Sequence, residues 1–139
     1  MKGSITWIEG GIFAAESGSG HGALMNAPLT AGAATIAPSP MEYVLLGTGG
    51  CTSTDVIEIL RKGRHDVHGC ICRLEAERAE SPPKVFTRIH MHFVVTGKGL
   101  KADAVQRAID LSAEKYCSAS IMLAKTATIS HSFELVEAA

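Results

Sequence analysis

One long predicted helix constrains this sequence more than any other feature. The stretch from Ser39 to Gly63 opens with Ser-Pro-Met-Glu, a capping box in which Ser39 and Glu42 satisfy each other's backbone amides. Pro40 takes the first helical position, where its missing N–H costs nothing. The stretch closes with two basic residues, which suit the negative end of the helix dipole, and with Gly63, which can adopt a left-handed conformation. We therefore predict about six turns of helix.

Glycines interrupt the middle of this helix. Gly47, Gly49 and Gly50 each weaken an isolated helix by up to about 1 kcal/mol relative to Ala. Such residues are tolerated where another backbone packs very close. The apolar residues around them cover too wide an arc for a single sheet to bury, which predicts an obligate homodimer. Cys51 follows directly, so this thiol is either packing material or a reactive group.

Composition narrows the class of protein. The chain of 139 residues is predicted to form a single domain over 1–139, and its hydrophobic content of 46% is enough for a core. A net charge of −1 gives no basic field for nucleic acid. No apolar run is long enough to span a bilayer, and the first ten residues lack the apolar segment of a signal peptide. We expect a cytoplasmic protein whose four cysteines are thiols.

Hydrophobic periodicity predicts an α+β domain of order β-β-β-α-β-β-α-β, with an antiparallel sheet packed on the long central helix. A segment of small residues without periodicity, 27–38, is predicted to be a loop. The expected elements are strands at 4–8, 12–15 and 23–25, the helix at 39–63, a hairpin of 67–78 and 85–96, a helix at 101–116, a short helical segment at 118–125 and a strand at 128–136.

The register of the hairpin follows from its alternating side chains. A four-residue turn at 81–84 places Cys72 opposite Phe93 on the apolar face and Glu77 opposite Arg88 on the polar face. A slip of one residue would bury charged side chains, so we predict this single register.

Two pairs on the hairpin, Cys70-x-Cys72 and His90-x-His92, have the residue types of a zinc site. The predicted register sends the two pairs to opposite faces, which excludes ligation by all four residues. The two cysteines are most simply small core residues. No metal and no cofactor is predicted.

Cys51 and Cys117 are the candidate reactive thiols, although buried apolar packing explains either one equally well. A reactive thiol needs a stabilised thiolate. Cys51 lies too deep in its helix for the dipole to help, and Cys117 is predicted at a helix C-terminus, where the dipole opposes ionisation. Activation must then come from side chains. Glu42, nine residues before Cys51, has the wrong charge to act directly but could position a cation.

At this point the sequence resembles a known family. Pro-x-Glu-(eight residues)-Cys opening a long helix, followed by a second Cys before Ser at a helix end, resembles the OsmC/Ohr superfamily of thiol-dependent hydroperoxide reductases. The resemblance covers nearly the whole chain and is strongest to the YhfA-like branch. The segments that carry it are Ser-Pro-Met-Glu at 39–42, Gly-Gly-Cys at 49–51, Phe-Val-Val-Thr-Gly at 93–97 and Ser-Ala-Glu-Lys-Tyr-Cys at 112–117.

This resemblance implies an intertwined homodimer whose two long helices cross at their glycines. It implies that Cys51 is the peroxidatic thiol, that Cys117 is the resolving thiol, and that Glu42 is the carboxylate near the site. It also implies an organic hydroperoxide as substrate and an external dithiol as reductant.

Two features depart from the family's peroxidases. Those proteins hold the attacking thiolate with an arginine from the N-terminal arm, whereas the first arginine here is Arg61. They commonly have Cys-Pro at the second cysteine, whereas this chain has Cys117-Ser118. The basic residues that could replace the arginine, from the same or the other subunit, are His21, Lys115 and Arg78.

The predicted function is reduction of organic hydroperoxides by the Cys51/Cys117 pair through a sulfenic acid and a disulfide. The alternative is a non-enzymatic dimer of the same fold that binds a small hydrophobic molecule between its helices.

Overall fold

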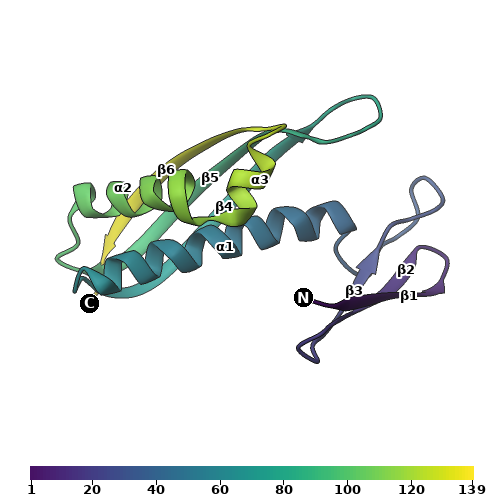
Figure 1. The fold of residues 1–139 in the computed structure, drawn as a ribbon, viewed down its shortest axis with the longest axis horizontal. Coiled ribbons are helices and arrows are strands. Elements are labelled where there is room, and N and C mark those ends of the chain that lie inside the picture. The colour runs from purple at the N-terminus through teal and green to yellow at the C-terminus, as the bar shows by residue number, and fades with distance from the viewer. The chain divides into compact units, whose positions relative to one another are not determined.

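A computed structural model describes all residues, 1–139, and the chain divides into two compact units, Met1–Val44 and Leu45–Ala139 (Figure 1). The elements are β1 (Gly3–Glu9), β2 (Ile12–Ser17), β3 (Gly22–Asn26), α1 (Pro40–Lys62), β4 (Asp66–Arg78), β5 (Phe86–Lys98), α2 (Ala102–Leu111), η1 (Ser112–Tyr116), α3 (Ser118–Leu123) and β6 (Thr128–Glu137). The predicted α+β fold class and element order are confirmed. None of the helices combines the length and the apolarity needed to cross a membrane.

The first unit is a three-stranded antiparallel sheet of order β1-β2-β3 followed by a loop. The predicted strands are confirmed, each slightly longer than expected. Buried Asn26 holds the loop in place, because its side-chain oxygen accepts the backbone amide of Ile36 at 3.0 Å and its backbone amide donates to the carbonyl of Pro38 at 3.0 Å. Gly11 is needed here, since a Cβ at this position would overlap the carbonyl oxygen of Ala27.

Helix α1 begins as predicted. The amide of Ser39 donates to Glu42 Oε2 at 2.7 Å, and the amide of Glu42 donates to Ser39 Oγ at 3.3 Å. These reciprocal bonds are the capping box. They also lower the pKa of the Glu42 carboxyl, first through the Ser39 amide and then through its hydroxyl.

The end of α1 differs from the prediction by one residue. Arg64, with φ +62°, takes the left-handed position that was expected at Gly63. The amide of His65 donates to the carbonyl of Leu60, and the amide of Arg64 to that of Arg61, which is the Schellman pattern. Gly63 instead leaves room for a neighbouring side chain, because a Cβ there would lie 3.0 Å from the imidazole of His65.

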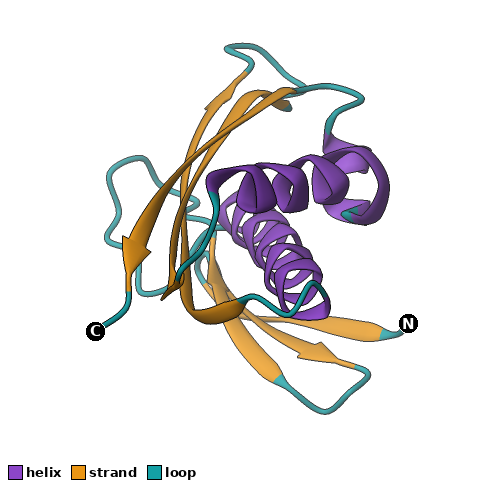
Figure 2. Ribbon diagram, turned by 90° about the vertical axis from the view of Figure 1, so that its left-hand side faces the viewer, coloured by secondary structure: helices purple, strands orange, loops and turns teal.

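The second unit contains a sheet of order β4-β5-β6 with its helices on one face (Figure 2). The predicted hairpin register is confirmed: Cys72 pairs with Phe93, and Glu77 pairs with Arg88. The last pair also forms an exposed ion pair at 3.5 Å. The alternation of apolar and polar side chains predicted this register correctly, because a slip of one residue would turn the apolar side chains away from the core.

The direction of the last strand was predicted wrongly. β6 pairs with β5 in a parallel arrangement, so the sheet is mixed. The helical segments α2, η1 and α3 connect the two strands and return the chain to the end of the sheet where β5 began. Such a crossover is what a parallel pair requires. Local sequence does not specify where a connection of this length returns.

The predicted helix over 101–116 is also interrupted. α2 ends at Leu111 and is followed by the wider turn η1, in which the amide of Cys117 donates to the carbonyl of Ser112 at 2.8 Å. Cys117 then has an extended backbone, φ −75° and ψ 98°, and begins α3 as its N-cap. The thiol therefore lies at a break between two helical segments.

The core of the second unit lies between the sheet and the helices. β5 contributes the side chains that were predicted to face inward, and α1 and α2 contribute the opposing layer. The fully buried members are Val56, Leu60, Ile89, Met91, Phe93, Val95, Val105, Ala108 and Ile109. The glycine at position 49 belongs to this packing, because a Cβ on Gly49 would lie 2.7 Å from Leu74 Cδ1.

His131 is half-buried and has a buried ring nitrogen without a hydrogen-bond partner. It stacks on Phe93 with ring centroids 6.3 Å apart, and its Nε2 is buried without a hydrogen bond. Burial lowers the pKa of His131 from 6.5, against a smaller opposing effect of Asp110. The neutral ring is the form that the fold accommodates.

This environment predicts an acid-sensitive fold. Because the pKa of His131 is lower in the folded than in the unfolded state, its contribution is fully present above the unfolded value of about 6.5 and is lost as the pH falls toward the folded value. His131→Phe should flatten the decline in the free energy of unfolding between pH 6.5 and pH 5, measured by urea denaturation. Measurements at pH 8 separate the packing change from the titration. An equally steep decline in both proteins would contradict this explanation.

Candidate functional site

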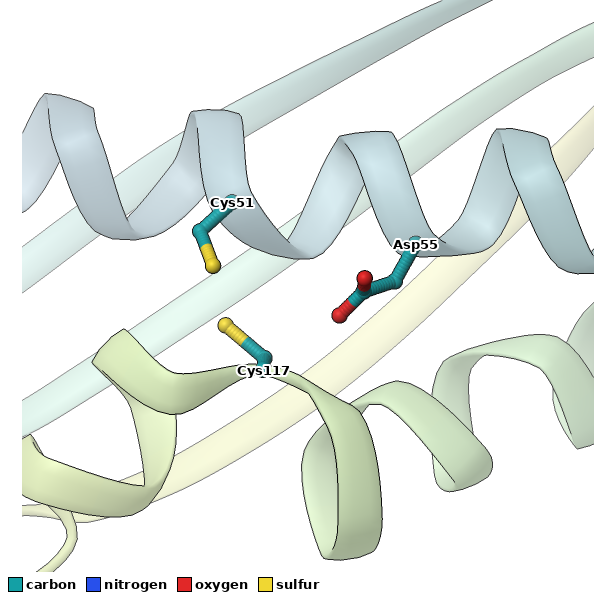
Figure 3. Close-up of side chains that lie close together, drawn as sticks. All are labelled: Cys51, Asp55 and Cys117. Atoms are coloured by element: carbon teal, nitrogen blue, oxygen red, sulfur yellow. The ribbon is translucent and has the colours of Figure 1, made fainter.

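The structure brings two of the predicted site residues together. Cys51 lies on α1 and Cys117 at the break between η1 and α3, and both are free thiols. Figure 3 shows their sulfur atoms facing each other, with the carboxylate of Asp55 beside them. The two sulfurs and one carboxylate oxygen all lie within 4.8 Å of one another. The candidate site is therefore a cluster of two thiols and one acid.

Cys117 lies in a cradle of hydrogen-bonding groups. Its side chain is fully buried, with 0% exposure. Thr52 Oγ1 of α1 lies 3.2 Å from its sulfur, and the amide of Ser120 donates to the same sulfur at 3.4 Å. The hydroxyls of Thr52 and Ser120 are 3.1 Å apart and complete the cluster. Buried polar side chains that satisfy one another in this way fix the position of the sulfur.

These contacts determine the ionisation of Cys117. Burial raises the pKa of this thiol, but hydrogen bonds from the Ser120 hydroxyl, the Thr52 hydroxyl and the Ser120 amide outweigh it, so the pKa is lowered overall. The predicted position at a helix C-terminus is confirmed, because Cys117 is the C-cap of η1, but the inference that this position opposes ionisation is wrong. Cys117 is also the N-cap of α3, and its sulfur accepts the backbone amide of Ser120.

Cys51 has the opposite tendency. A hydrogen bond from the backbone of Ala119 lowers the pKa of this thiol, but burial, the neighbouring Cys117 sulfur and the charge of Asp55 together raise it. Cys51 is also the more exposed of the two thiols. Within the single chain, negative charge is therefore stabilised on Cys117 in preference to Cys51.

Sequence reasoning missed Asp55. It lies one turn after Cys51 on α1, so the two side chains share a face of the helix. Ser112 Oγ of η1 donates to Asp55 Oδ2 at 2.9 Å and orients the carboxylate. The spacing Cys-x-x-x-Asp was the available signal. The spacing alone does not indicate a site, because Cys117 and Ser112, which lie beside Asp55, are distant in sequence.

Glu42 remains a predicted site residue. Its carboxylate caps α1 within the first unit, as described above. The three residues suggested as replacements for the family's arginine each have a local partner. His21 Nδ1 lies 3.0 Å from Ser19 Oγ, Arg78 donates to the Lys84 carbonyl at 2.8 Å, and Lys115 lies over the Tyr116 ring.

The second cysteine pair differs from the first. Cys70 and Cys72 lie on β4, half-buried, and burial raises the pKa of both thiols, that of Cys72 to about 11. The Ser53 hydroxyl of α1 is a hydrogen-bonding neighbour of both sulfurs, so they face the helix layer. On the opposite face of the sheet, His90 and His92 contact serines of β6. The predicted exclusion of a site made from both pairs agrees with this geometry.

The fold and the cluster define a class of protein: an α+β domain in which a long helix presents one thiol to a second thiol, which is carried by the helical segments on the same face of the sheet. A family model described as OsmC-like protein matches residues 32–132, and the chain belongs to this family.

Individual relatives agree with the assignment. The chain is 51% identical over 138 residues to Protein YhfA of Escherichia coli K12, covering 99% of this chain and 100% of that one. Among solved structures, an OsmC-like protein from Mycoplasma pneumoniae has a TM-score of 0.82 at 15% identity, covering 97% of this chain and 96% of the other. The organic hydroperoxide resistance protein OhrB of Bacillus subtilis has a TM-score of 0.65 at 16% identity, covering 96% and 98%.

The position of Asp55 predicts a change in thiol reactivity. Asp55→Asn removes a negative charge that raises the pKa of Cys51 but keeps an oxygen to accept the Ser112 hydroxyl. Cys51 should therefore be alkylated faster by iodoacetamide at neutral pH, as measured by peptide mass spectrometry. Glu58→Gln is the matched control, because Glu58 is an exposed acid of the same helix that pairs with Lys62. Equal rates in the two variants would show that Asp55 does not act on the thiol.

Proposed function

We propose that this protein is a thiol-dependent peroxidase that reduces organic hydroperoxides through Cys51 and Cys117. The observation that carries the proposal is the approach of two sulfurs from elements 66 residues apart in sequence to within 4.8 Å. Neighbours of the same fold are named organic hydroperoxide resistance proteins, from Bacillus subtilis and Legionella pneumophila. This supports the same chemistry here.

In the proposed reaction, the Cys51 thiolate attacks the O–O bond of the hydroperoxide. The terminal oxygen is transferred to sulfur as a sulfenic acid, and the other oxygen leaves as an alcohol after taking a proton. The Cys117 thiolate then attacks the Cys51 sulfur, which forms the disulfide and releases water. An external dithiol returns both residues to thiols by exchange. Cys51 is assigned the first step because it is the more exposed sulfur.

The two thiols suit these steps unequally. The lowered pKa of Cys117 favours the second step, since only the thiolate attacks the sulfenic acid. Cys51, whose pKa is raised, needs a cation for the first step. We assign this function to a basic residue held by Glu42, with His21, Lys115 and Arg78 as the candidates, from the same or a second subunit.

A homodimer belongs to the same proposal. Along α1, Val44 and Leu46 are 42% and 51% exposed, and Gly47 and Gly50 have open space where a Cβ would stand. A second copy of the helix crossing at these glycines would bury this apolar surface.

The thiols and the absence of any basic surface field fit a cytoplasmic protein that acts on small molecules, with neither nucleic acid nor membrane as partner.

A pocket of about 450 Å³ between α1 and α2 favours a second candidate function, the binding of a small hydrophobic molecule. Its lining includes the apolar side chains of Ile59, Leu60 and Leu111 and the charged side chains of Lys101, Asp103 and Arg107, and it contains no cysteine. Stopped-flow addition of cumene hydroperoxide separates the two candidates. Fast thiol consumption supports the peroxidase, and slow consumption supports the binding protein.

Peroxide treatment should produce one specific disulfide. One equivalent of cumene hydroperoxide is expected to join Cys51 to Cys117 and to leave Cys70 and Cys72 reduced, as read by peptide mass mapping. Neighbouring same-face residues on one strand are poorly placed to bridge. Cys51→Ser should abolish the reaction, and Cys117→Ser should stop at the sulfenic acid, which a dimedone probe traps. Free Cys51 and Cys117 after about tenfold excess peroxide would refute the proposed function.

The glycines provide a test of the dimer. A Cβ at position 50 would meet nothing within 4 Å in the single chain, and leucine is a better helix former than glycine, so Gly50→Leu should keep the fold and disrupt assembly. Gly49→Leu is the contrasting variant, because its side chain would strike Leu74 and should destabilise the chain itself. Sedimentation velocity at micromolar concentration and circular dichroism distinguish the two effects. A folded wild-type monomer at that concentration would contradict the dimer.

A further inference from the structure

We propose that the reduced site binds a thiophilic divalent cation, Zn²⁺, through the sulfurs of Cys51 and Cys117 and a carboxylate oxygen of Asp55. The proposal requires the two thiols to be in their reduced form. It stands whether or not the protein reduces hydroperoxides.

The geometry suits this ion. Zinc bonds of about 2.3 Å to sulfur and about 2.0–2.2 Å to oxygen, in a tetrahedron, place ligand atoms about 3.5–3.8 Å apart. The three atoms here lie within 4.8 Å of one another, so small side-chain rotations would close the site. Three protein ligands leave a fourth position for water. Figure 3 shows all three side chains directed into one space.

The donor set and its charge favour the same ion. Thiolates select soft and borderline metals, whereas Ca²⁺ and Mg²⁺ prefer sites made only of oxygen. Asp55 and two thiolates together would place like charges side by side, which is unfavourable unless a cation lies between them. A carboxylate directed at a pair of thiols is unexpected in a site that serves only to ionise them, and is expected in a metal site.

Neighbouring residues already orient the proposed ligands. Ser112 donates to Asp55 Oδ2 at 2.9 Å, which leaves the other oxygen for the ion. Thr52 and Ser120 hold the Cys117 sulfur, as described above. Outer-shell hydrogen bonds of this kind typically change metal affinity by about 10- to 100-fold.

Metal binding and oxidation would exclude each other. Zn²⁺ displaces one proton from each thiol and forms two zinc–sulfur bonds. A hydroperoxide oxidises the two sulfurs to the disulfide. The two electrons cleave the O–O bond to an alcohol and water, with two protons taken from solvent, and Zn²⁺ is released. The site would therefore hold zinc only in its reduced form.

The test is a zinc titration of the full-length reduced protein, in competition with a chromophoric chelator of micromolar affinity. One equivalent should bind, and Co²⁺ in its place should show thiolate-to-metal charge-transfer absorption. Asp55→Asn should weaken zinc binding by about tenfold or more, and Ser112→Ala by about tenfold. Protein converted to the disulfide should lose the site. Cys117→Ser, which removes a ligand, should abolish zinc binding. Circular dichroism establishes that each variant is folded, and Asp55→Asn keeps the test decisive if Cys117→Ser does not fold.

The double variant Cys70→Ser/Cys72→Ser is the matched control, since it removes the other cysteine pair and should keep one equivalent of zinc. Loss of binding in this control would overturn the proposal. So would an affinity that Asp55→Asn leaves unchanged, or failure of the reduced protein to compete with the chelator. Specific disulfide formation without zinc binding would refute the metal site alone, and zinc binding without disulfide formation would refute the peroxidase alone.

Discussion

The buried hydrogen bonds of Thr52 hold the site together. Its hydroxyl oxygen lies 3.2 Å from the Cys117 sulfur, 3.1 Å from the Ser120 hydroxyl and 3.0 Å from the Thr48 carbonyl oxygen of its own helix. These contacts attach the break after η1 to the middle of α1. Breaking one partner of such a buried network leaves the others unsatisfied, at a cost of about 1–3 kcal/mol for each group. The distance between the two thiols depends on this attachment.

The same cluster explains why two chemically identical side chains differ. Cys117 is surrounded by donors, whereas Cys51 lies beside a carboxylate and another sulfur. The donors come from α3 and from α1, and the carboxylate is held by Ser112 of η1. The interruption between α2 and α3 therefore determines how these groups are placed around the two thiols. A continuous helix through 112–123 would turn the backbone amide of Ser120 away from the sulfur.

The proposed peroxidase and zinc chemistry both depend on how close Cys51, Cys117 and Asp55 lie to one another. A nucleophile, a stabilised second thiol and an acid within 4.8 Å form a compact group that can be oxidised to a disulfide or can bind a soft cation. The source of positive charge at Cys51 distinguishes the two reactions. In peroxide reduction a basic residue would stabilise the Cys51 thiolate, and in zinc binding the metal ion itself would do so.

Sequence by itself determined the features that depend on local rules. The capping box at Ser39 and the hairpin register were predictable, because hydrogen-bonding side chains at fixed spacing and the period of two along a strand act over a few residues. The parallel direction of β6 and the surroundings of Cys117 were not. Thr52 lies 65 residues from Cys117, and nothing near either residue specifies their contact. Only the packing of α1 against the segments that cross over the sheet decided which thiol is stabilised.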